Sequence, residues 1–191
     1  PTPRDLPDVP HIHGTSEQAT QCGAGYAGAA DRLCILAVLR HYGRGELSAF
    51  LVPSCSDERM DRDQLLLTGY SDEELQAQFD NMSLYGEQGV RFKRLFTSYV
   101  DGINHYISQV LLDPSKLPGD YAAAVGPPTT WTVKDVIAIA GLVGGIFGKG
   151  GGGELDNAGL ISYLEKQIGA APAKQVLTSF RSANDPLAPT T

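Results

Sequence analysis

Residues 132–157 read TVKDVIAIAGLVGGIFGKGGGGELDN, and the rest of the chain is interpreted around them. The first part, through Val143, is nearly all apolar, so it predicts a helix that lies in the core. Thr132 is the expected N-cap of this helix, and Asp135 lies near the positive end of its dipole. Four consecutive glycines at 150–153 then make a helix costly, because glycine loses the most backbone freedom when it is ordered. We therefore expect the chain to turn sharply at the glycines, beside a ligand pocket.

Two carboxylates, Glu154 and Asp156, follow this turn. They could bind Ca2+, which prefers several oxygen ligands in an adaptable geometry. Acidic residues are also expected in the first turn of a helix, for capping and because of the helix dipole, and Asp156 or Asn157 is a suitable cap. Taken alone, the two residues favour the capping role over the metal.

Other segments carry clear helical patterns. Ser71 and Glu74 have the spacing of a capping box and predict a helix directly after them. Apolar residues recur at three- and four-residue spacing over 92–111, which predicts an amphipathic helix of about five or six turns. Residues 29–43 predict a buried helix that ends at glycines, and Pro172 can open a last helix.

Three segments are expected to be non-helical. Residues 9–13 follow a proline and predict a short strand that would place His11 and His13 on one face, as ordinary hydrogen-bonded histidines. Residues 21–28 are rich in Gly and Ala and are interpreted as a strand or close turn. Residues 51–62 are interpreted as a loop. The chain is thus predicted to be largely helical, with a strand or two near its start.

The composition excludes several classes of protein. At 191 residues the chain can form one sizeable core, and we expect residues 1–191 to be a single segment. A net charge of −7 with scattered Lys and Arg argues against nucleic-acid binding. No apolar run reaches 18 residues, so no membrane span is expected. The three cysteines, Cys22, Cys34 and Cys55, lack metal-type spacing, and whether two of them form a disulfide stays open.

No complete catalytic site is recognisable in the sequence. There is no Gly-x-Ser-x-Gly or Ser-x-x-Lys motif, and none of the four histidines lies in a motif that pairs it with Ser or Cys. Gly148 and Lys149 do not form a phosphate loop, because the required upstream glycine and following Ser or Thr are missing. From the residues alone the chain is an acidic helical domain, and one interpretation is a stand-alone helical domain whose Gly-rich loop binds a ligand.

The order of six short motifs, however, resembles the α chain of the penicillin acylase family. The motifs span nearly the whole chain, and they are Val9-Pro10-His11-Ile12, Gly23-Ala24-Gly25-Tyr26 with Ala30-Asp31-Arg32-Leu33, Tyr99-Val100-Asp101-Gly102-Ile103-Asn104, Trp131-Thr132-Val133-Lys134-Asp135-Val136, Glu154-Leu155-Asp156-Asn157 and Asp185-Pro186-Leu187-Ala188-Pro189-Thr190-Thr191.

The resemblance implies a fold and an activity. The family consists of N-terminal-nucleophile hydrolases with a four-layer αββα (α+β) fold, made as a precursor that cleaves itself into an α and a longer β chain. The expected activity is N-acyl amide hydrolysis by a periplasmic or secreted heterodimer. The nucleophile would be the N-terminal Ser of the β chain, so this chain would hold no catalytic residue. No organic cofactor is implied.

The resemblance also assigns site residues. Glu154 matches an α-chain carboxylate that binds structural Ca2+ together with β-chain ligands. Gly144 and Gly148 fall on positions where penicillin G acylases line the acyl pocket with Met and Phe, and Phe147 falls on an Arg position. Without two bulky walls, a pocket for a longer or bulkier acyl group is expected, as in β-lactam, acyl-homoserine lactone or lipopeptide substrates. Cys34, after Asp31-Arg32-Leu33, is similar to the branch that removes fatty acyl chains.

Overall fold

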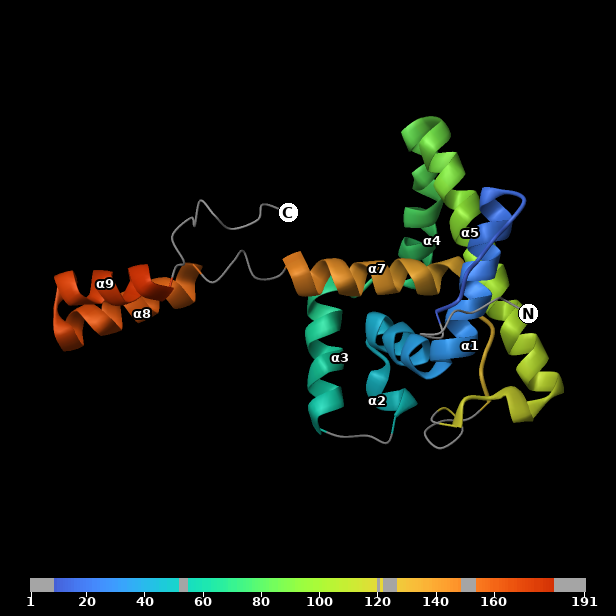
Figure 1. Ribbon diagram of the computed structural model, residues 1–191. Coiled ribbons are helices and arrows are strands. Elements are labelled where there is room, and N and C mark those ends of the chain that lie inside the picture. The colour runs from blue at the N-terminus through green and yellow to red at the C-terminus, as the bar shows by residue number, and fades with distance from the viewer. Residues whose placement is uncertain (1–8, 52–54, 120, 122–126, 149–153, 181–191) are drawn as a thin grey trace. The chain divides into compact units, whose positions relative to one another are not determined.

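The structure is a computed structural model that describes residues 9–51, 55–119, 121, 127–148 and 154–180. The chain divides into two compact units, Pro1–Phe147 and Gly148–Thr191, and each is described by itself. Within the described residues the chain is helical, and β structure is limited to a single bridge residue at Pro10 (Figure 1).

The helices follow one another with short connections. In the first unit they are α1 (Glu17–Arg44), α2 (Leu47–Phe50), α3 (Cys55–Thr68), α4 (Asp72–Asn81), the 3-10 turn η1 (Met82–Tyr85), α5 (Gly86–Leu112), the 3-10 turn η2 (Pro114–Lys116) and α7 (Val133–Gly148). The second unit holds α8 (Glu154–Ile168) and α9 (Ala170–Phe180), which form an antiparallel pair (Figure 1).

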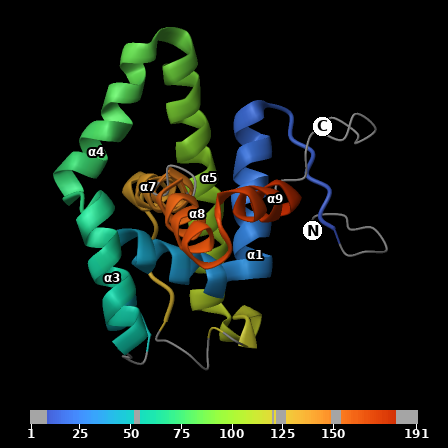
Figure 2. The same cartoon turned by 90° about the vertical axis from the view of Figure 1, so that its left-hand side faces the viewer.

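The core of the first unit is the contact between α1 and α5, which lie side by side in both views (Figures 1 and 2). Glycines set the distance between these helices. A Cβ atom at Gly25 of α1 would overlap the carbonyl oxygen of Tyr99, and one at Gly102 of α5 would overlap that of Cys22. Leu33 and Ile103 are fully buried beside this contact. The two helix backbones therefore touch directly, without intervening side chains.

This contact explains why residues 21–28 are helical. The prediction of a strand or turn there was wrong, because these residues lie inside α1. Ser16 caps α1 by accepting a 3.1 Å hydrogen bond from the Ala19 amide, and Gly45 ends it with a left-handed φ of 68°. The low helix propensity of the Gly and Ala residues is offset by the close approach of α5 that they allow.

Two other non-helical predictions were also wrong in part. Residues 9–13 form no strand beyond the bridge at Pro10, since no second strand is available within the described residues to pair with them. Helix α3 begins at Cys55, inside the expected loop 51–62, and Asp57 and Glu58 in its first turn complement the helix dipole.

The strongest local patterns were confirmed. Ser71 accepts a hydrogen bond from the Glu74 amide at 3.2 Å, and Glu74 accepts one from the Ser71 amide at 2.8 Å, so the capping box forms at the start of α4. The periodic segment 92–111 lies within α5, and its apolar face is buried against α1.

Helix α1 is also long and apolar enough, by length and composition, to cross a membrane, whereas the sequence predicted no span. In this structure it is the central helix of the first unit. A disulfide between Cys22 and Cys34 is excluded, because both lie on α1, about 18 Å apart along the helix.

Candidate functional site

Helix α7 is firmly held at its beginning. Ile137, Ala138 and Leu142 are buried, in contact with α4 and the core. Asp135, in the first turn, is fully buried, and its Oδ2 accepts hydrogen bonds from the Thr132 amide at 2.7 Å and the Thr132 hydroxyl at 3.0 Å. The predicted start of the helix is thus correct, with Thr132 directly before it.

The second half of α7 is exposed, so the expectation that the whole helix lies in the core holds only for its first half. Phe147 is 85% exposed and Ile146 is 54% exposed. A Cβ atom at Gly144 or Gly148 would meet no atom within 4 Å. Gly144 and Gly148 are one turn apart on the same face of the helix, next to Phe147. The structure therefore brings the three predicted acyl-pocket residues together at one open end of α7.

Glu154, the predicted calcium ligand, is the first residue of α8. The glycine turn at 149–153 before it lies outside the described residues. Asp156 and Asn157 lie within the first turn of α8 and not at its cap, because the helix begins earlier than expected. No group of three His, Cys, Asp or Glu side chains that could hold a metal ion occurs among the described residues. Since Ca2+ takes six to eight oxygen ligands, this chain is suited to contribute part of a calcium site.

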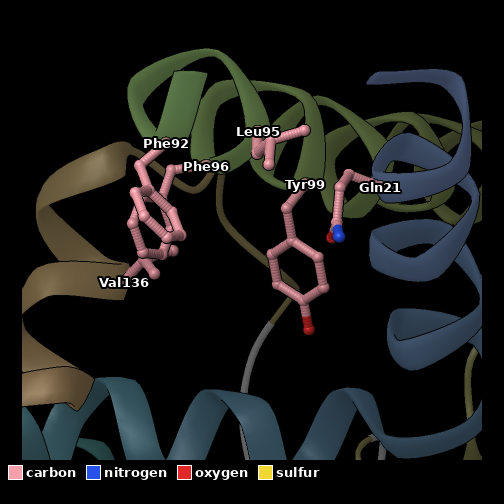
Figure 3. A pocket seen from close by; sticks show the side chains of 6 residues that line it. All are labelled: Gln21, Phe92, Leu95, Phe96, Tyr99 and Val136. Atoms are coloured by element: carbon pink, nitrogen blue, oxygen red, sulfur yellow. The ribbon is translucent and has the colours of Figure 1, made fainter. Parts of the chain in front are cut away.

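An apolar pocket of about 270 Å³ lies where α5 faces α7 and α1 (Figure 3). Phe92, Leu95, Phe96 and Tyr99 of α5 line it together with Val136 of α7 and Gln21 of α1. Burial raises the pKa of Tyr99, which keeps its hydroxyl neutral. The lining contains no Ser, Cys or charged side chain, so this pocket is suited to binding an apolar group and not to a reaction.

A second pocket surrounds His41 at the end of α1. The imidazole stacks on Phe50 at a centroid distance of 4.1 Å, and its Nδ1 lies 3.7 Å from a carboxylate oxygen of Glu46. Burial, followed by the charge of Arg40, lowers the pKa of His41. No Ser or Cys lines this pocket, so among the described residues His41 has no nucleophile to activate.

The sequence matches the penicillin amidase family over residues 3–184. The chain belongs to the penicillin amidase family. It is also similar to a solved structure, the thermostable penicillin G acylase from Alcaligenes faecalis, with 28% identity and a TM-score of 0.67. The match covers 100% of this chain and 95% of that chain.

The fold prediction is thereby confirmed. This penicillin amidase family chain is the mostly helical α chain of a four-layer αββα N-terminal-nucleophile hydrolase heterodimer. Its family activity is hydrolysis of an amide bond. The absence of a catalytic group among the described residues is in keeping with an α chain.

Sequence reasoning missed the partners of Asp135. Its Oδ1 accepts hydrogen bonds from Nε of Arg40 at 3.1 Å and from Nε of Arg44 at 2.7 Å. These arginines are one turn apart on α1, and Asp135 is an acid in a nearly apolar helix. Charged residues are seldom fully buried without a partner, so a buried ion pair between the two helices could have been suspected from this pattern.

Proposed function

We propose that this chain is the α subunit of an N-acyl amidohydrolase that removes a hydrophobic acyl group from an amine. The family membership carries this proposal, and the open end of α7 narrows it. Hydrolysis would leave a free carboxylic acid and a free amine. The amine could belong to a β-lactam nucleus, a homoserine lactone or a peptide.

The reaction itself takes place on the β chain in this proposal. Its N-terminal Ser attacks the amide carbonyl, and the α-amino group of the same residue serves as the base. The oxyanion hole belongs to the β chain as well. The α chain then has to bind and orient the acyl group, which is a task for apolar and aromatic surface.

The acyl group lies against the exposed end of α7. Gly144 and Gly148 offer a surface without side chains, and Phe147 offers an exposed ring beside it. Because larger residues at 144 and 148 would fill this space, the two glycines favour a long or bulky acyl group. Phenylacetyl, a compact group, is the less favoured substrate.

Glu154 contributes one ligand to a structural Ca2+ that it shares with the β chain. Its place at the start of α8 and the lack of a complete metal cluster among the described residues both suit a shared site. The ion adds no step to the reaction and holds the two chains together. We place the enzyme in the periplasm or outside the cell, after self-cleavage of a precursor.

A substrate panel tests this proposal. The heterodimer is produced from the full precursor and assayed with N-acyl p-nitroanilides that carry straight chains of graded length and a phenylacetyl group. We expect kcat/KM to be highest for a chain longer or bulkier than phenylacetyl. A matched variant with Ala as the first β-chain residue should be inactive on all of them. Highest activity on the phenylacetyl compound would contradict the acyl-group assignment, and no hydrolysis at all would contradict the activity.

A further inference from the structure

The buried carboxylate of Asp135 connects α7 to α1 through two arginines. Asp135 is 0% exposed, and its Oδ1 accepts hydrogen bonds from Nε of both Arg40 and Arg44. Its Oδ2 is taken by Thr132, as described above. Both oxygens are therefore satisfied, and each of the two arginines fixes the first turn of α7 against the end of α1.

Arg44 extends this connection to a third helix. Its NH1 group donates to Oδ1 of Asp72, in the first turn of α4, at 2.7 Å. The other oxygen of Asp72 accepts from Lys134, the neighbour of Asp135 on α7. The Arg44 side chain is only 17% exposed, so these ion pairs are less screened by water than surface pairs are. One guanidinium thus joins α1, α4 and α7.

The rest of α7 has little to hold it in place. Backbone contact with Gly43 ends at Ala138 and Ile139, and the nearest atoms to Gly141 are those of Thr68 and Tyr70, at 3.8 Å. Beyond that point the helix is exposed. Gly144 lies about 13 Å along the helix from Asp135, so a tilt of about 5° at the arginine contact moves it by about 1 Å. A small change at the beginning of α7 is thereby felt at the predicted acyl wall.

We infer that Arg44 is a positioning residue that holds α7 in place and through it sets the acyl preference. The inference rests on the proposed function of α7. Arg44 touches no substrate, and its effect passes entirely through Asp135, Asp72 and the helix that they hold. Lysine cannot replace it fully, because one ammonium group cannot keep the planar two-nitrogen geometry that reaches both carboxylates.

The test compares Arg44→Gln and Arg44→Lys with Arg91→Gln in the complete heterodimer. Arg91 pairs with Glu17 between α5 and α1 on the exposed surface and does not contact α7, so it is the matched control. Two quantities are measured. The first is the ratio of kcat/KM for the preferred acyl p-nitroanilide to that for a chain four carbons shorter, and the second is hydrogen exchange of the α7 amides from Ile137 to Leu142.

In Arg44→Gln we expect the ratio to move toward one by about fivefold or more and exchange in α7 to become faster, with Arg44→Lys intermediate. Arg91→Gln should leave both unchanged. The ratio does not depend on how much enzyme is folded, so simple destabilisation leaves it as in the wild type. An unchanged ratio, unchanged α7 exchange, or an equal effect of Arg91→Gln would overturn the inference. A wild-type heterodimer that hydrolyses no acyl amide would instead refute the proposed function, and the exchange data alone would then decide whether Arg44 holds α7.

Discussion

The direct backbone contact between α1 and α5 makes a sharp prediction for Gly25→Ala. The added Cβ atom would overlap the Tyr99 oxygen and lie 2.9 Å from the Tyr99 carbonyl carbon and 3.2 Å from the Ile103 amide nitrogen. All of these atoms belong to the backbone, so no side-chain rotation relieves the overlap. The helices must separate by about 1 Å to restore normal contact distances.

The expected loss follows from two opposing effects. Overpacking against a rigid neighbour costs about 3 kcal/mol, at the upper end of its usual range. Alanine regains about 1 kcal/mol of helix propensity over glycine. The net destabilisation is about 2 kcal/mol, which lowers the melting temperature of a chain of this size by about 4–8 °C.

Gly28→Ala is the matched control on the same helix. Its Cβ atom would meet only the Tyr99 hydroxyl, at 3.5 Å, which is an ordinary contact. This variant should melt at or slightly above the wild-type temperature. Both variants are compared as heterodimers by circular dichroism during heating. If Gly25→Ala melts within about 1 °C of Gly28→Ala, the close contact between α1 and α5 is refuted.

Three further predictions concern the site and its supports. Gly144→Met should reduce kcat/KM about tenfold for long acyl chains and less for short ones, because the side chain fills the open face of α7; equal losses across chain lengths would remove Gly144 from the pocket. Glu154→Ala should lower the calcium content or the yield of assembled heterodimer, measured by elemental analysis and size exclusion, and unchanged calcium would exclude Glu154 as a ligand. Hydrogen bonds from Lys134 and then Arg44 hold the pKa of Asp72 at about 2, below its ordinary 3.8. The stability from this lowered pKa is present above pH 3.8 and is lost as the pH falls toward 2, so Asp72→Asn should lose less melting temperature than the wild type between pH 5 and pH 2.5. Equal losses would show that Asp72 does not contribute.

Local patterns predicted those parts of the fold that depend on neighbouring residues. The capping box at Ser71 and the periodic face of α5 require only contacts within one helix, and both were confirmed. Residues 21–28 could not be predicted in this way, because their glycines serve a helix that lies about 75 residues further along the chain. The local rule against glycine in helices was outweighed by tertiary packing.

The candidate site shows the same division. The start of α7 at Thr132 and the location of Gly144, Phe147 and Gly148 near its end follow from the sequence and the family resemblance. The charge pairing of Asp135 does not, because its two arginines are 91 and 95 residues away in sequence. Local reasoning gave Asp135 a role at the helix dipole, whereas the structure gives it a buried role between helices.

The central claim is that this chain functions as half of a self-processed acylase. The most direct measurement is native mass spectrometry of the protein purified after expression of its full precursor, with N-terminal sequencing of each chain found. We predict this chain in a one-to-one complex with a longer chain that begins with Ser. Recovery of the 20.4 kDa chain alone, stable and without a second chain that begins with Ser, Thr or Cys, would contradict the account.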